Sequence, residues 1–179
     1  MSALLKLNTI ELSYTGSPES VDNQMADLYR SLELKHPKFF KMNSLCKLGF
    51  LGCVSLIEPY QEELREAEKD QVATIFFNQY ASIASDHIHH TSLNENTLPS
   101  PAVFVYTLPN ILNGEISIYY GWTGYNAFFI TDTGDEELMQ RIIEDALYMQ
   151  PFKYCIAGQV ETDLMSEKYS ARLSLFKVD

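Results

Sequence analysis

Alternating apolar and polar positions predict a strand near each end of the chain. Residues 5–14 (LKLNTIELSY) alternate between two sets of side chains, which is typical of a strand with one buried face, and the turn-forming residues at 15–18 end the run. Residues 169–175 alternate in the same way, with the apolar side chains at odd numbers. Both segments are predicted to be half-buried strands, and the second runs almost to the last residue.

Three further runs are apolar on both faces. They are residues 72–80 (VATIFFNQY), 125–131 (YNAFFIT) and 154–160 (YCIAGQV). Their β-branched and aromatic residues and the absence of proline favour buried strands.

Apolar residues at helical spacing predict a buried helix over residues 39–58. A stripe of five residues recurs every three or four positions: Met42, Cys46, Phe50, Cys53 and Ile57. Leucines and valine widen this stripe around most of the helix, which is typical of a helix in the protein interior.

Residues 134–149 carry the signals of a second, amphipathic helix. Thr133 and Glu136 form a Thr-x-x-Glu capping box, and the first turn is acidic, as the helix dipole favours. Apolar residues then recur at helical spacing, and Pro151 follows the expected end.

The other segments are less regular. Residues 20–34 are weakly helical, 61–70 form a charged turn or helix end, and 82–98 are polar and irregular. Residues 99–120 contain ISIYY, whose local propensity favours a strand. Strands separated by helices imply a layered α/β fold with a largely parallel or mixed sheet.

Composition narrows the classes of function. The chain has 179 residues and a net charge of -11, which disfavours binding to nucleic acids or anionic membranes. No signal peptide or apolar run long enough to span a membrane is recognised. Three cysteines without paired spacing do not suggest a disulfide framework, so a cytoplasmic protein is expected.

Three stretches together resemble the N-terminal half of a β-ketoacyl-acyl-carrier-protein synthase. They are residues 41–50 (KMNSLCKLGF), residues 100–126 with their Leu-Pro-Asn and Gly-x-x-Gly-x-Asn sequences, and residues 155–162 (CIAGQVET). Their order and spacing agree with that family. They are most similar to a short, divergent branch from aryl-polyene and flexirubin-type pigment clusters.

The resemblance implies a fold. It indicates the N-terminal half of a thiolase fold, with a mixed, mostly parallel central sheet and helices on both faces. Residues 1–179 then form a single domain, in which 171–178 resemble the first strand of the family's C-terminal half. The resemblance also favours a helix over a strand for residues 99–120.

Departures from the family suggest that the chain is not catalytic. The nucleophilic cysteine of active synthases falls on Thr133, next to Asp132. The two histidines and the lysine of the C-terminal half have no counterpart here. A Claisen condensation needs a thiolate, a histidine pair and an oxyanion hole. Thr133 is more simply a helix cap, so no catalytic residue and no cofactor are expected.

In ketosynthases the strand matching residues 125–131 pairs across the dimer axis. The resemblance therefore implies an interface at Asn126, Phe128, Phe129 and Ile130, with Phe129 on the side opposite Phe128 and Ile130. An isolated half would also expose an apolar face. The chain is thus expected to pair with itself or with a full-length ketosynthase.

Three functions follow. The first is a non-catalytic partner subunit, chain-length-factor-like or a scaffold, in fatty-acid or aryl-polyene-type biosynthesis. The second is a hydrolase or acyltransferase acting on acyl thioesters, against which the missing nucleophile argues. The third is a homodimeric protein that binds acyl groups or acyl carrier protein, although two acidic proteins would repel each other.

Two other groups of residues invite a functional interpretation. Asp86, His87, His89 and His90 could hold a metal, with His87 and His89 on one side of an extended segment, but no further ligand is evident and no metal site is predicted. An aromatic cluster could line an acyl tunnel or an interface, although core packing is the simpler interpretation: Tyr119, Tyr120, Trp122 and Tyr125.

Overall fold

The computed structural model describes residues 4–94, 100–132 and 136–178. The strands are β1 (Leu4–Thr15), β2 (Val72–Asn78), β3 (Asn126–Ile130), β4 (Tyr154–Asp163) and β5 (Lys168–Val178). The α-helices are α1 (Pro18–Ser31), α2 (Ser44–Ile57), α3 (Gln61–Glu66), α4 (Ile83–Asn94), α5 (Pro101–Val105), α6 (Ile111–Tyr120) and α7 (Glu136–Met149). Short 3-10 turns cover Pro37–Lys41, Glu58–Tyr60 and Lys69–Gln71.

The strands form one mixed sheet in the order β1-β5-β4-β2-β3. β2 runs parallel to β3 and β4, whereas β5 runs antiparallel to β4 and β1. The connections explain the directions, because a short turn joins β4 to β5 while helices separate the three parallel strands. The predicted mixed α/β architecture is confirmed. The resemblance of residues 171–178 to a second half stays a prediction, and in this structure they lie in β5, which is paired on both edges.

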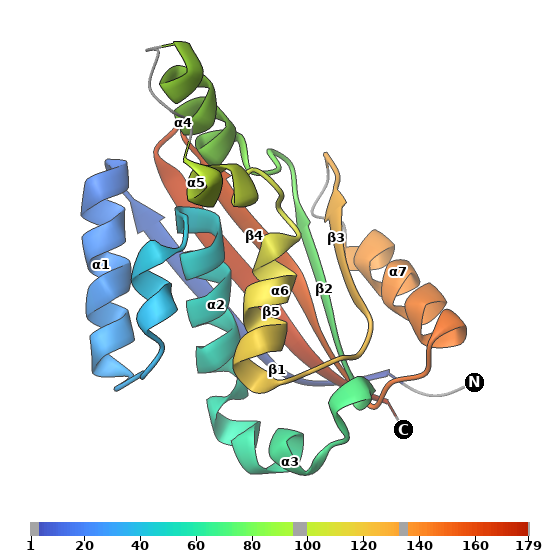
Figure 1. Cartoon of the computed structure of the whole chain (residues 1–179). Coiled ribbons are helices and arrows are strands. Elements are labelled where there is room, and N and C mark those ends of the chain that lie inside the picture. The colour runs from blue at the N-terminus through green and yellow to red at the C-terminus, as the bar shows by residue number, and fades with distance from the viewer. Residues whose placement is uncertain (1–3, 95–99, 133–135, 179) are drawn as a thin grey trace.

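Helices cover both faces of the sheet (Figure 1). One core lies under α1, α2 and α6 and includes Phe76, Ile156 and Leu173. A smaller core lies under α7 and includes Ile75 and Cys155. Every residue of β2 is buried because the strand is covered on both faces, which is why its sequence is continuously apolar.

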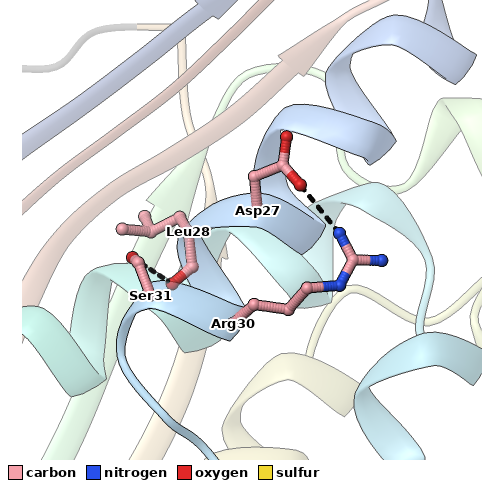
Figure 2. A network of polar contacts seen from close by, with 4 residues as sticks. All are labelled: Asp27, Leu28, Arg30 and Ser31. Carbon is pink, nitrogen blue, oxygen red and sulfur yellow. Dashed lines mark hydrogen bonds and ion pairs between the residues drawn. The ribbon is translucent and has the colours of Figure 1, made fainter.

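The outer surface of α1 is held by short-range polar contacts. Arg30 forms an ion pair with Asp27 at 2.7 Å, and the Ser31 hydroxyl donates to the Leu28 carbonyl at 2.8 Å (Figure 2). The opposite side of the helix buries Val21, Met25, Ala26 and Tyr29.

The helix expected over residues 39–58 begins later than predicted. Residues Pro37–Lys41 form a 3-10 turn, and α2 begins at Ser44, where the Asn43 side chain caps it by accepting the Cys46 N–H at 2.9 Å. Nearly all of α2 is buried, as its apolar circumference indicates. Its one buried cation, Lys47, is paired with Asp22.

Two segments show tertiary contacts overriding local sequence. Residues 82–98, expected to be irregular, contain the helix α4, whose start is fixed by the Ser82 hydroxyl donating to the Thr107 carbonyl. Residues 111–120 are helical despite ISIYY, because α6 buries Leu112 and Ile116 against the sheet. The helix implied there by the resemblance is confirmed.

The expected buried strand at residues 125–131 is the edge strand β3. Its residues are half-buried or exposed because only β2 lies beside it. Within the described residues, no helix is both long and apolar enough to cross a membrane.

Candidate functional site

β3 presents an unpaired backbone edge. The Tyr125 carbonyl accepts the Thr74 N–H at 2.9 Å, and Thr131 donates its N–H to the Asn78 carbonyl at 2.8 Å, so the odd-numbered residues face β2. Peptide groups alternate along a strand, and those of Asn126, Phe128 and Ile130 therefore point to the free edge. Such an edge is a template for pairing with another strand.

The side chains of β3 divide between the two faces of the sheet. Phe128 packs against the core under α2 and α6. Phe129 packs under α7 and stacks on Phe77, with ring centroids 5.6 Å apart. Ile130 is 61% exposed at the end of the strand, and Asn126 is exposed at its start. The four residues predicted at an interface thus form one edge with apolar and polar members.

No cysteine lies at the end of β3. Asp132 is exposed there. Thr133, which aligns with the family nucleophile and was predicted to cap the following helix, lies outside the described residues. Cys46 and Cys53 are buried in α2 and Cys155 in β4, where burial raises the pKa of each thiol. These thiols are placed as core residues and not as nucleophiles.

Hydrogen bonds close the carboxyl ends of the neighbouring strands. The Asn78 side chain accepts the Ala81 N–H at 2.9 Å and donates to the Ala81 carbonyl at 2.7 Å. The Glu161 carboxylate accepts the Gln79 N–H at 2.6 Å, while its burial raises its pKa. In open α/β sheets this end is the usual position of a ligand site, but here a turn occupies it.

Next to this turn, α4 and α5 lie at the end of the sheet (Figure 1). Ile88, Phe104, Val105 and Leu108 are each more than two-fifths exposed. Scattered exposed apolar residues are ordinary, but these four lie on two contacting helices and the turn after α5, and together they form a surface suited to a partner.

The histidines of α4 do not form a metal site. Because the segment is helical, His87 and His90 share a side, and not His87 and His89 as an extended chain would require. His89 lies against the Phe104 ring, 5.5 Å between centroids. Among the described residues, no three histidine, cysteine or acidic side chains gather around a possible ion.

The segment that carries β3, α4 and α5 has no lysine or arginine of its own. The sequence has no lysine or arginine between Lys69 and Arg141. Asp86 and Asp132 are exposed in this interval, and the exposed Glu136 is paired with Arg172 of β5. The free edge of β3 therefore exposes apolar side chains, and the charged residues in this interval are acidic.

A buried carboxylate that the sequence interpretation missed lies on α6. Glu115 is 3% exposed, accepts a hydrogen bond from the Tyr106 hydroxyl at 3.0 Å and pairs with Lys38 at 2.8 Å. Burial and this carboxylate raise the pKa of Tyr106, and burial lowers the pKa of nearby His36. The only signal in the sequence is that Glu115 is the one charged residue of a mostly apolar helix.

The family-like motifs have structural explanations here. Gly124 lies so close to the start of β2 that a Cβ would be 2.4 Å from the Val72 carbonyl oxygen. Asn113 is fully buried and donates to the carbonyls of Thr74 and Ala127 at 3.0 and 3.1 Å, which joins α6 to two strands. These motifs position β3.

The expected apolar face of an isolated half is absent. On the α7 side, β1 and β5 present exposed polar residues beyond the helix, including Glu11, Ser170 and Arg172. The outer side of α7 is charged, and its Arg141 pairs with Glu137. Among the described residues this face is adapted to water, so the expected apolar face is not found there, and β3, α4 and α5 are the candidate surface for a partner.

Solved structures resemble this chain, whereas no family model and no curated protein matches it. A ketosynthase (ApeO) in complex with its chain length factor (ApeC) from Xenorhabdus doucetiae has a TM-score of 0.67 at 13% identity, over 97% of this chain and 78% of that chain. The ishigamide ketosynthase/chain length factor has a TM-score of 0.67 at 13% identity, over 84% and 47% of the two chains.

A third neighbour is a type II polyketide synthase acyl-carrier protein in complex with its ketosynthase. Its TM-score is 0.64 at 12% identity, over 98% of this chain and 63% of that chain. At such identities the likeness establishes the fold alone. The predicted ketosynthase-like thiolase fold is confirmed, and this chain spans about half to three-quarters of each neighbour's length.

Proposed function

We propose that this protein is a non-catalytic, chain-length-factor-like partner of a ketosynthase, in fatty-acid or aryl-polyene-type biosynthesis. The observation that carries the proposal is the free edge of β3, with its outward peptide groups, in a fold shared with ketosynthase/chain length factor complexes. In this role residues 1–179 act as one domain in the cytoplasm.

The chemistry of the chain supports a role without catalysis. All three thiols are buried in the core, and Asp132 places negative charge where an anionic intermediate would form. The partner supplies the nucleophile and its bases. The role of the present chain is to stabilise that partner and to shape its acyl channel.

Charge favours a different chain over a second copy as the partner. Two copies meeting at β3 would bring Asp132 and the neighbouring acidic residues together with no lysine or arginine from residues 70–140. A partner with basic residues around an apolar centre would complement this surface. The same acidity disfavours direct docking of an acidic carrier protein.

The proposal is tested by co-expression with a full-length ketosynthase encoded beside it, followed by purification and native mass determination. We expect a stable heterodimer. Ile130→Pro should reduce complex formation at least about tenfold, because the proline removes an outward N–H without removing a bond to β2. Ile130→Thr separates the loss of the apolar side chain from the loss of the N–H.

Leu5→Thr on the opposite edge strand, 49% exposed, is the matched control and should leave the complex intact. A stable monomer in the presence of the ketosynthase would overturn the proposal. Equal complex formation by Ile130→Pro and the wild type would exclude β3 as the contact.

A further inference from the structure

We infer that the hollow between α3 and the end of α6 is a binding site for a small aromatic carboxylate. The hollow has a volume of about 470 Å³, within the range of ligand pockets. It lies where β2 begins, away from the end of β3, and the inference does not depend on the proposed function.

An aromatic wall forms one side of the hollow. Tyr120 stacks on Trp122 with ring centroids 4.3 Å apart and an interplanar angle of 12°. Tyr119 meets Tyr120 edge-on at 4.8 Å. Ile57 and Leu64, both buried, complete an apolar lining. A flat apolar body can stack or pack edge-on against such a wall.

The polar atoms of this wall are available to a ligand. Among the described residues, the Tyr120 hydroxyl and the Trp122 indole N–H have no hydrogen-bond partner; Trp122 is buried and Tyr120 is half-buried. Buried tyrosine and tryptophan usually have such partners. A bound carboxylate or water molecule would accept hydrogen bonds from the Tyr120 hydroxyl and the Trp122 N–H.

Both charged residues that line the hollow are cations, in a chain whose net charge is -11. They are Arg65 and Lys69, and neither has an ion-pair partner in the part of the chain that the structure describes. The other three arginines are all paired with carboxylates: Arg30 with Asp27, Arg141 with Glu137, and Arg172 with Glu136. An unpaired guanidinium presents a planar fork that matches a carboxylate.

The backbone holds Lys69 beside the aromatic wall. Its carbonyl accepts the Thr123 N–H at 2.8 Å. Gly121, with a φ of 73°, joins Tyr120 to Trp122, and the Lys69 Nζ is 3.7 Å from the position of a Cβ there. The Lys69 ammonium therefore lies at one end of the aromatic wall. An aromatic acid could pack its ring against the wall and place its carboxylate at this ammonium.

Acidic side chains in a neighbouring hollow at α3 limit how much negative charge a ligand can carry. Glu58, Glu62, Glu63 and Glu66 line a separate hollow adjoining Gln61. These carboxylates would repel a polyanion, so the site suits a single carboxylate.

Trp122 is the only tryptophan, and its fluorescence reports directly on this site. The test is a titration of the purified chain with phenylpropanoate, which leaves tryptophan emission readable. Phenylpropanol serves as the neutral control and hexanoate as the control without a ring. We expect saturable binding of phenylpropanoate, at least about tenfold tighter than phenylpropanol, which cannot make the charge-assisted hydrogen bonds. It should also bind more tightly than hexanoate, which lacks the ring that packs against the aromatic wall.

An Arg65→Gln, Lys69→Gln double variant should bind phenylpropanoate at least about tenfold more weakly. The matched control is Arg141→Gln, which removes an exposed arginine from α7 and should bind like the wild type. The inference is overturned if phenylpropanoate gives no saturable response, if the alcohol binds as tightly as the acid, or if the double variant binds unchanged.

Discussion

Lys38 places its ammonium 2.8 Å from the Glu115 carboxylate, although the lysine side chain is 47% exposed and the glutamate is buried. The pair joins the segment before α2 to α6, and it neutralises a charge inside the largest core. A buried carboxylate without its cation is far more costly than a polar residue at the surface.

Lys38→Met should therefore destabilise the protein by about 1–2 kcal/mol, less than for a fully buried pair because water reaches the lysine. The double variant Lys38→Met, Glu115→Gln should lose less free energy of unfolding than the sum of the losses in the two single variants. Urea denaturation of the four proteins in this cycle measures the coupling. Additive effects would show that the pair contributes nothing.

Asn113→Ala should destabilise the protein by about 1–3 kcal/mol, because it removes the hydrogen bonds that a fully buried side chain makes to two strands. Hydrogen exchange should rise most at β3. Asn110→Ala is the control, since that side chain makes no capping hydrogen bond, and it should change stability by less than about 0.5 kcal/mol. Equal losses in both variants would contradict the assigned role of Asn113.

Two glycines should respond to alanine in opposite directions. Gly124→Ala should cost at least about 2–3 kcal/mol, since its Cβ would meet the Val72 backbone. Gly114→Ala should stabilise α6 by about 0.5–1 kcal/mol, because nothing lies within 4 Å of the added Cβ. Thermal unfolding of both variants tests this contrast, and a tolerated Gly124→Ala would be incompatible with the described loop.

Glu63 should make stability depend on pH in the acidic range. Hydrogen bonds from Lys177 and then Tyr154 lower the pKa of this carboxylate below its usual value. Its contribution is therefore present above the unfolded-state pKa and is lost as pH falls through the lower folded-state value. Denaturation midpoints between about pH 7 and about pH 3 should fall less steeply in Glu63→Gln than in the wild type. Parallel curves would refute this prediction.

The three cysteines should resist thiol reagents in the folded protein. Burial raises the pKa of Cys46, Cys53 and Cys155, and the thiolate is the reactive form. A thiol reagent should label all three cysteines only when denaturant has unfolded the protein. Rapid labelling of one thiol under native conditions would reveal local opening at that residue.

Much of the sheet could be predicted from sequence because β2 and β4 are buried on both faces and are continuously apolar. The amphipathic pattern likewise located α7, although Thr133 of its predicted capping box lies outside the described part of the chain, whereas α1 was predicted only as a weakly helical segment. α4 was missed because its residues show no helical apolar stripe. Its start is held by contacts with Thr107 and Asn43 that lie far away in sequence.

By itself, the sequence determined a layered α/β fold, because apolar runs and helical stripes alternate along it, and the absence of a thiol at residues 132–133; its resemblance to ketosynthases implied the ketosynthase-like fold. Only the tertiary structure decided that β3 is an edge strand, that the face expected to be apolar is polar, and that Glu115 is buried beside Lys38. The aromatic and cationic residues of the proposed carboxylate site also meet only after folding. Strand order and helix packing are set by contacts between distant residues, and a local pattern of apolar and polar positions does not contain them.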